Sequence, residues 1–292
     1  MHKESTSRKI FLVVNLSLLI IISLITILPL LHVLALSFSS STAIDQGKVS
    51  FFPVDFTLHN FSYVFQDVSI LKSFGVTIFI TVFGTIFNLI ATASLAYPLS
   101  RSEFLGRRFI LLMVLFTMIF SAPLIPTYLV VQSLGLLDTI WALIFPTAIS
   151  AFNLFVMRSF FSQIPSDLID ASRIDGMGEI RILFKVVLPL SKPAMATLGI
   201  FYAVVHWNSY FHALMFIENR NLYPLQIKLR EMIVDDSFQS DPSSELFASM
   251  LSSSPEGIKM ATIVVATVPI VLIYPFLQKY FIKGFMLGSL KD

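Results

Sequence analysis

Long apolar stretches alternate with shorter polar segments along this 292-residue chain. A bilayer core of about 30 Å needs about 20 apolar residues in helical form, so uncharged stretches of that length predict membrane-spanning helices. Six stretches qualify, at about residues 10–38, 73–98, 109–132, 139–157, 193–217 and 260–280. The pattern predicts an all-α integral membrane protein with six transmembrane helices, which form a single domain over residues 10–292.

Lysines and arginines are unequally shared between the segments that join these stretches, with 14 on one side and 6 on the other. The larger group lies in residues 1–9, 101–108, 158–192 and 279–291. Because cytoplasmic flanks retain basic residues, the N-terminus at 1–9 and the tail at 281–292 are both expected in the cytoplasm. Segments 39–72 and 218–259 are then external loops. The first stretch is longer than a signal-peptide core, which favours a retained helix.

Composition narrows the possible chemistry. The chain is 55% hydrophobic and 13% charged, with a mean hydropathy of +0.81, whereas a soluble domain is roughly 25% charged. It has no cysteine and a net charge of +2, which argues against a thiolate centre and a nucleic-acid partner. The histidines have no carboxylate companions at ligand spacing, and no acid–base constellation stands out. We therefore expect neither a metal site nor catalytic residues.

The segment between the fourth and fifth stretches, residues 158–192, differs from the other connections because charges of both signs alternate with apolar residues in a helical rhythm. The pattern predicts a helix of two to three turns within residues 166–178. Ser166 is the expected N-cap, Asp167 suits the positive helix end, and Gly176 suits an exit with positive φ. So short a helix needs neighbouring protein to persist.

This segment also carries a sequence motif, which reads Ile164-Pro165-x-x-Leu168-x-Asp170-Ala171-Ser172-x-Ile174-Asp175-Gly176 and continues as Phe184-x-x-Val187-Leu188-Pro189-Leu190-x-x-Pro193. The motif resembles the EAA loop of ABC importer permeases, and its details resemble the maltose-type carbohydrate family. Where that family has Glu-Ala-Ala and Asp-Gly-Ala, this chain has Asp170-Ala171-Ser172 and Asp175-Gly176-Met177. Trp207-Asn208-Ser209-Tyr210 and Tyr223-Pro224-Leu225-Gln226 resemble further family segments. The long external loops resemble the subgroup that imports complex oligosaccharides, including uronate polymers such as alginate.

The resemblance implies an ABC type I importer permease fold with a cytoplasmic coupling helix in a multi-pass protein of the bacterial cytoplasmic (inner) membrane. The chain would be non-catalytic, with ATP and Mg bound by partner subunits, and no Gly-x-x-x-x-Gly-Lys-Ser/Thr loop occurs in it. Implied partners are a second permease subunit in a heterodimer, two ATP-binding cassette subunits, an extracytoplasmic solute-binding protein, a carbohydrate and membrane lipid. Asp170 is expected to meet a basic ATPase residue. The residues implied in ATPase coupling are Leu168, Asp170, Ala171, Ser172, Asp175 and Gly176.

A sugar pathway needs polar groups and aromatic faces inside the bundle. The densest cluster in the apolar stretches comprises Tyr202, His206, Trp207, Asn208, Tyr210 and His212. On one continuous helix Tyr202, His206 and Tyr210 would share a face. Asn88, Gln132 and Asn153 are isolated candidates. For each residue a helix–helix hydrogen bond or an interfacial aromatic is the alternative role.

Two other classes of function compete with an ABC permease. An ion-coupled secondary transporter usually carries ionisable residues within the membrane, but the stretches hold no Asp, Glu, Lys or Arg up to Gln278, and no inverted repeat is evident. An integral-membrane enzyme would need the catalytic constellation that we do not find. Two other features have plainer explanations: Pro123 and Pro126 are expected to bend the third stretch, and membrane orientation is expected to explain Arg101, Arg107 and Arg108.

Overall fold

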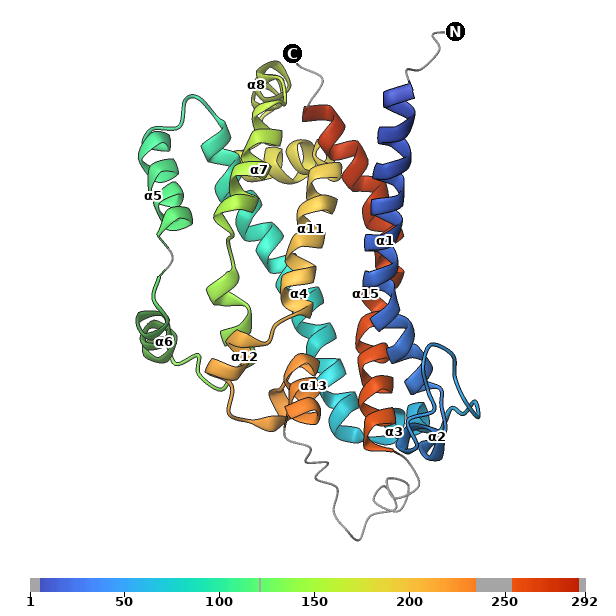
Figure 1. The fold of residues 1–292 in the computed structure, drawn as a ribbon. Helices are drawn as coiled ribbons and strands as arrows, with labels where there is room; N and C mark the ends of the chain where they lie inside the picture. Colours follow the sequence, from blue (N-terminus) through green and yellow to red (C-terminus); the bar gives the residue numbers. More distant parts are fainter. Residues whose placement is uncertain (1–5, 121, 235–253, 289–292) are drawn as a thin grey trace. The chain divides into compact units, whose positions relative to one another are not determined.

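The computed structural model describes residues 6–120, 122–234 and 254–288, in which all regular structure is helical (Figure 1). Residues 1–5 and 289–292 of the expected cytoplasmic ends, and 235–253 of the second expected external loop, lie outside the described residues. The longer helices are α1 (Thr6–Ser37), α3 (His59–Gln66), α4 (Val68–Ser100), α5 (Arg107–Ile119), α6 (Leu124–Ser133), α7 (Ala151–Ser162), α8 (Ser166–Ile174), α11 (Lys192–Trp207), α13 (Leu225–Val234) and α15 (Pro255–Gly288). The short ones are α2 (Ser41–Asp45), η1 (Ile140–Leu143), η2 (Phe145–Thr147), α9 (Glu179–Ile182), η3 (Leu183–Val187), α10 (Leu188–Leu190), α12 (Phe211–Phe216) and η4 (Arg220–Leu222).

Residue contacts divide the chain into two compact units. The first comprises Met1–Leu71 and Leu229–Val268. Within it, a small apolar cluster joins the last turns of α1 to α2 and the loop after it. Asn60 of α3 is buried and donates two hydrogen bonds of 3.1 Å to the carbonyl oxygens of Ser37 and Ser39. The segment after α1 is therefore folded onto the end of that helix.

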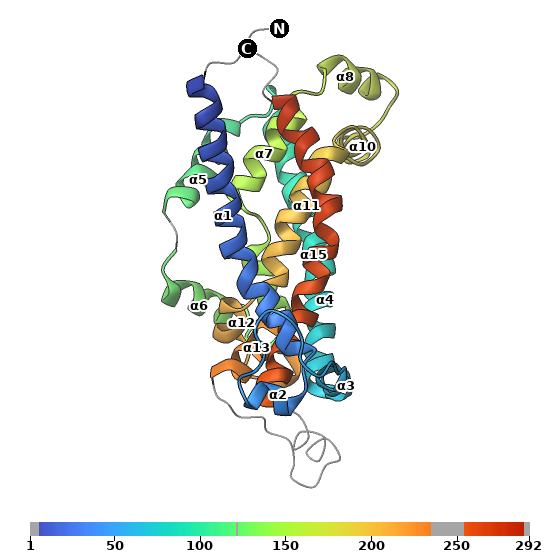
Figure 2. The same cartoon turned by 45° about the vertical axis from the view of Figure 1, so that its right-hand side comes forward.

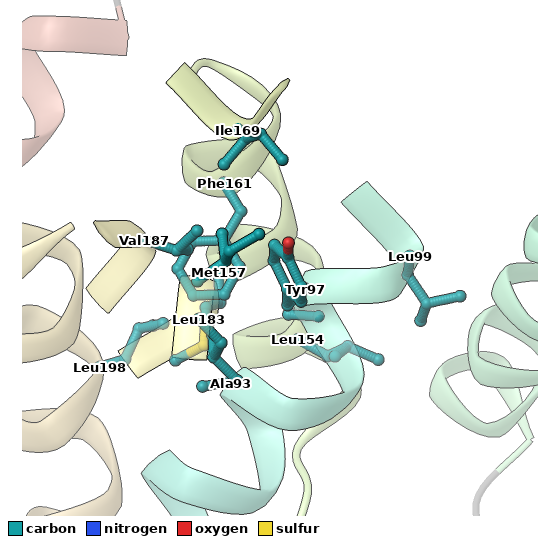
Figure 3. Packing of buried hydrophobic residues seen from close by; sticks show 12 residues of the cluster. Ala93, Tyr97, Leu99, Leu154, Met157, Phe161, Ile169, Leu183, Val187 and Leu198 are labelled. Atoms are coloured by element: carbon teal, nitrogen blue, oxygen red, sulfur yellow. The ribbon is translucent and has the colours of Figure 1, made fainter. Parts of the chain in front are cut away.

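The second unit comprises Lys72–Lys228 and Pro269–Asp292. Its largest apolar core is built from α4, α7, α9, η3 and α11, with Ile169 of α8 at its edge (Figure 3). Ala93 and Ala96 of α4 are fully buried there, because small side chains let helix backbones approach closely. Within this unit α8 lies at one end, and α6 and α12 lie at the other (Figures 1 and 2).

Three helices are long and apolar enough to cross a membrane: Arg8–Ser37 of α1, Val68–Ser100 of α4 and Pro255–Ile273 of α15. Two bent pairs qualify if each counts as one span. Ile140–Thr147 meets Ala151–Ser162 at 54°, and Glu179–Leu190 meets Lys192–Trp207 at 89°. The described residues thus hold three to five candidate spans, compared with the six expected from hydropathy.

In the third apolar stretch the structure differs from the single helix that hydropathy predicts. The stretch divides into α5 and α6, whose 13 and 10 residues are each too short to cross alone. Phe120 ends α5 in an extended conformation, and Pro123 is the N-cap of α6. A proline has no N–H to continue a helical ladder, so the expected bend at Pro123 is confirmed as a full break. Pro126 lies in the first turn of α6, where proline is tolerated.

Candidate functional site

The short helix expected in the polar segment is α8, Ser166–Ile174. Asp167 lies in its first turn, and Gly176 leaves it with a φ of 79°, as predicted. The prediction for the N-cap was wrong, because Pro165 takes that position and Ser166 is the first helical residue. The Ser166 hydroxyl donates to the side chain of Asp167 at 3.4 Å and caps no backbone N–H. Proline suits this place because its fixed φ and missing N–H cost nothing before a first turn.

The two faces of α8 differ sharply in exposure. Ile169 and Ser172 are buried, and Figure 3 shows Ile169 reaching toward Phe161 and the core cluster. Leu168 and Ile174 are exposed, the latter to 86%. Since an 86% exposed isoleucine gains nothing from burial in this chain, the outer face presents apolar side chains without internal support, beside the exposed carboxylates of Asp167 and Asp170.

Of the residues implied in coupling, all but one lie on the exposed side. Leu168, Ala171, Asp175 and Gly176 are exposed, whereas Ser172 is buried and donates to the carbonyl oxygen of Leu168 at 2.7 Å. Asp170 is exposed too, but Arg173 of the same helix donates to its Oδ1 at 3.1 Å. The basic partner expected on another protein thus has an equivalent within α8. Sequence reasoning overlooked this pair, although a three-residue spacing of opposite charges signals it.

Two arginines near α8 join the ends of α4 and α7 by hydrogen bonds. Arg101 donates to the carbonyl oxygen of Phe161 at 2.7 Å, and Arg158 donates to that of Leu99 at 2.8 Å. Each guanidinium satisfies a carbonyl at the C-terminal end of the other helix, where the helix dipole favours a positive charge. We had expected membrane orientation to explain Arg101, but this residue is only 9% exposed and joins two helices, so orientation alone does not account for it.

In the middle of the second unit, neutral hydrogen bonds join α4, α7 and α11. The hydroxyls of Tyr202 and Thr92 lie 2.7 Å apart, and the backbone N–H of Ser150 donates to the Tyr202 hydroxyl at 3.1 Å. Tyr202 is therefore an acceptor from Ser150 and a partner of Thr92. Both side chains are buried, so these contacts replace hydrogen bonds to water that neither group can make.

His206 makes the second buried contact of this kind. Its Nε2 lies 3.0 Å from Nδ2 of Asn88, which also donates to the carbonyl oxygen of Thr147 at 3.0 Å. An amide nitrogen only donates, so Nε2 acts as the acceptor and the ring is neutral with its hydrogen on Nδ1. The helices meet closely here, because a Cβ added to Gly84 would lie 2.5 Å from Nε2. Tyr202 and His206 thus hold helices together.

The remaining residues of the polar cluster do not continue the face of Tyr202 and His206, contrary to the prediction of one helix. α11 ends at Trp207, and α12 begins at Phe211 with Tyr210 as its N-cap. Asn208 at this break is exposed, and its side chain donates to the carbonyl oxygen of Val204 at 2.9 Å. Trp207 meets Phe74 edge-on at 6.0 Å.

Tyr210 and His212 lie beyond the break. Tyr210 is partly buried against an apolar cluster, and His212 stacks on Phe216 with ring centroids 5.9 Å apart. Of the isolated candidates, Asn153 is buried and Gln132 is exposed. The break between α11 and α12 therefore leaves Asn208 exposed and Tyr210 and His212 partly buried, whereas Trp207 is buried.

Comparison with known proteins gives the family. Residues 93–286 match the family described as binding-protein-dependent transport system inner membrane component. That range covers α8 and the polar cluster of α11. The chain belongs to this family.

Individual relatives agree over nearly the whole permease. It is 46% identical to Protein LplC of Bacillus subtilis (strain 168) over 293 aligned residues, which cover 100% of this chain and 98% of LplC. It is 45% identical to the polygalacturonan/rhamnogalacturonan transport system permease protein YtcP of the same organism, over 89% of this chain and 91% of YtcP. A solved structure of a bacterial ABC transporter involved in the import of the acidic polysaccharide alginate matches with a TM-score of 0.88 and 37% identity, covering 96% and 100% of the two chains.

Family membership decides between the classes of function weighed from sequence. The chain is a non-catalytic permease subunit of a binding-protein-dependent ABC importer in the membrane, with the ABC importer permease fold. It is neither an ion-coupled secondary transporter nor a membrane enzyme. In this family ATP is hydrolysed on partner subunits.

Proposed function

We propose that this permease forms the translocation pathway for an acidic oligosaccharide or polysaccharide in the bacterial inner membrane. Two relatives support this substrate class: YtcP is named for polygalacturonan and rhamnogalacturonan, and the matching solved structure for alginate. Galacturonan and alginate are both built from uronic acids, so a chain related to both is best matched to carboxylated sugars. Neutral oligosaccharides are the alternative, since a relative 31% identical is named for melibiose, raffinose and stachyose.

The outer face of α8 is the site at which ATP hydrolysis drives this pathway. The observation that carries this role is the exposed surface of Leu168, Ala171 and Ile174 on a helix anchored from below by Ile169. An apolar helix face without internal support fits a groove on another protein. Its occupant is one of two ATP-binding cassette subunits, which carry ATP and Mg. Asp170, Asp175 and Gly176 border the contact.

The complete importer contains a second, different permease subunit and an external solute-binding protein. Within it this chain crosses the membrane six times, with both termini in the cytoplasm, because basic residues are concentrated on the side of α8. The pieces α5 and α6 together form the third crossing. Broken backbone is tolerated at membrane depth where protein covers it or where it lines a water-filled cavity, and a second permease subunit supplies either setting.

The break between α11 and α12 contributes to the substrate pathway. Asn208 is exposed there, and Trp207, Tyr210 and His212 lie within five residues of it. Sugar hydroxyls that leave water need hydrogen bonds, and aromatic faces pack on sugar rings. Tyr202 and His206 support this wall by fixing α11 against α4.

Reconstitution of the full importer in liposomes tests the substrate. We expect binding protein loaded with trigalacturonate to stimulate ATP hydrolysis and uptake, and binding protein mixed with maltotriose to do neither. Stimulation by maltotriose alone would replace the acidic substrate with a neutral one. Uptake driven by an ion gradient without ATP would overturn the importer mechanism.

Substitutions at the break test the pathway. Asn208→Ala and Tyr210→Ala are expected to change the ratio of trigalacturonate to maltotriose uptake. Tyr128→Phe on α6 is the matched control, and its ratio should equal that of the unmodified protein. Equal ratios in all four proteins would remove Asn208 and Tyr210 from the pathway.

A further inference from the structure

Arg173 of α8 makes contact with three carboxylates from three segments of the chain. Its NH2 group donates to Glu103 Oε1 at 2.9 Å, its Nε to Glu179 Oε1 at 2.9 Å, and its NH1 to Asp170 Oδ1 at 3.1 Å. Glu103 lies in the connection between α4 and α5, and Glu179 begins α9. The planar guanidinium with its five donors can hold three acceptors at once, which a lysine ammonium does with far less geometric restraint.

The contact through Glu179 continues into the buried core. Glu179 Oε2 accepts a hydrogen bond of 2.6 Å from the hydroxyl of Tyr97, a residue of α4 that is 5% exposed. Arg101 lies over the Tyr97 ring, 5.4 Å from its centroid. A continuous set of polar contacts therefore runs from α8 through Arg173 and Glu179 to the end of α4.

Apolar packing gives α8 little other support. Ile169 is its only large apolar side chain that is buried among the described residues. Cavities of about 860 and 710 Å³ lie beside the helix, and both are lined by Arg173 and Glu103. The Arg173–Glu103 pair thus bridges open space. Ile169 is the apolar anchor within α8, and partly buried Ile164 and Met177 pack against the same core on either side of it, so polar contacts have to set the angle of the helix between these points.

The electrostatics favour keeping these contacts in the charged form. The backbone N–H of Glu103 and the Arg173 side chain hold the pKa of the Glu103 carboxyl below its usual value. Both groups of the pair are substantially exposed, which limits what the contact adds to stability. Its contribution is to orientation, since a planar fork fixes direction as well as distance.

We propose that Arg173 is the positioning residue of the coupling helix, which fixes α8 at one angle to α4 so that movement of α8 displaces α4. This proposal rests on the proposed role of α8 in ATPase coupling. Without Arg173, α8 turns about Ile169. Part of any displacement of α8 by an ATPase subunit is then absorbed by the loops on either side of the helix and does not reach α4. The family motif does not include Arg173 among the residues that we matched, and neither carboxylate partner outside α8 lies in it.

Spin labels measure this orientation directly, because the chain has no cysteine of its own. Labels at Ser166→Cys on α8 and Ile90→Cys on α4 report the distance between the two helices in the assembled, vanadate-trapped importer. We expect a narrow distribution of label distances in the importer that retains Arg173, and a distribution at least about twice as wide in Arg173→Met. Arg173→Lys should fall between them. Arg181→Met, which removes an exposed arginine from neighbouring α9, is the matched control and should stay narrow.

A substitution of one carboxylate sharpens the test and guards against misfolding of Arg173→Met. Glu103→Gln nearly preserves shape and removes a contact between segments, so it should broaden the distribution. Equal widths for Arg173→Met, Glu103→Gln and the unmodified protein would overturn the proposal.

A photo-crosslinking residue at Ile174 separates this proposal from the one on which it rests. With Arg173 in place, the photo-crosslinking residue should crosslink to an ATP-binding cassette subunit. The absence of that crosslink would overturn the coupling role of α8. A normal crosslink together with an unchanged distance distribution in Arg173→Met would overturn only the role of Arg173. With both proposals correct, Arg173→Met keeps the crosslink while trigalacturonate-stimulated ATP hydrolysis falls to the basal rate.

Discussion

Polar side chains are used differently at the α8 end of the second unit and in its middle. At the α8 end Arg173 joins three exposed carboxylates, whereas in the middle Tyr202 and His206 make neutral hydrogen bonds in full burial. A buried charge costs several kcal/mol even after relaxation, so a membrane interior favours neutral donors and acceptors with fixed geometry. Exposed ion pairs contribute little energy and adjust easily, which suits an element that is pushed by another protein.

The largest effect is expected from the apolar anchor of α8. Ile169→Ala removes a side chain that is 1% exposed, and such truncations cost about 2–5 kcal/mol. Thermal unfolding of the permease purified without its ATPase subunits and limited proteolysis within residues 158–192 measure this loss. Ile174→Ala is the control, since that side chain is 86% exposed and its loss should leave thermal unfolding unchanged. Equal effects of the two substitutions would contradict the division of α8 into an inner and an outer face.

The close approach of α4 and α11 predicts a smaller loss in the middle of the unit. Gly84→Ala would bring a Cβ to 2.5 Å from His206 Nε2, so the ring must leave Asn88 or the helices must separate. Overpacking of this kind costs about 1–3 kcal/mol, measurable as a lower unfolding temperature. Gly75→Ala on the same helix meets nothing within 4 Å and should be neutral or slightly stabilising. A tolerated Gly84→Ala would mean that the His206 contact is dispensable.

Removal of one buried hydroxyl tests the neutral network itself. Tyr202→Phe deprives Thr92 and the Ser150 N–H of their partner, and leaving a buried polar group unpaired costs about 1–3 kcal/mol. Chemical or thermal unfolding of the importer reports the change. Tyr128→Phe, whose ring stacks on Phe216, gives the matched loss of a hydroxyl at a partly exposed site. If Tyr202→Phe lowered the free energy of unfolding no more than Tyr128→Phe, the buried hydrogen bonds of Tyr202 would contribute no more to stability than contacts at a partly exposed site.

The smallest effect on stability, with a large effect on coupling, is expected at the exit from α8. Gly176 has a φ of 79°, where a β-branched residue is strained by about 1–2 kcal/mol. Gly176→Val should therefore abolish substrate-stimulated ATP hydrolysis in the assembled importer while membrane insertion persists. Gly178→Val lies two residues on, with a φ of −73° and equally open surroundings, and should retain most of the stimulation. Unchanged stimulation in Gly176→Val would argue against α8 as a rigid lever.

Local pattern was enough to find α8 because its signals are local. Asp167 in the first turn and Gly176 at the exit act within a few residues, through the helix dipole and backbone φ. The contact between Arg173 and Glu103 was overlooked because Glu103 lies 70 residues away in sequence, and only packing brings the two side chains within 2.9 Å. The break after Trp207 was missed for a related reason: the apolar stretch is continuous, and hydropathy measures length without backbone direction.

By itself the sequence determined the class of the protein, its long apolar stretches and the motif of its family. These follow from composition and from spacing along one chain, because transfer to a bilayer and helix propensity are nearly additive over neighbouring residues. Only the tertiary structure decided that Ser172 faces inward, that Arg173 joins three segments, and that Tyr202 and His206 are buried in contacts with α4. Those outcomes depend on which distant residues meet, and pairwise contacts between remote parts of a chain leave no periodic trace in the order of its amino acids.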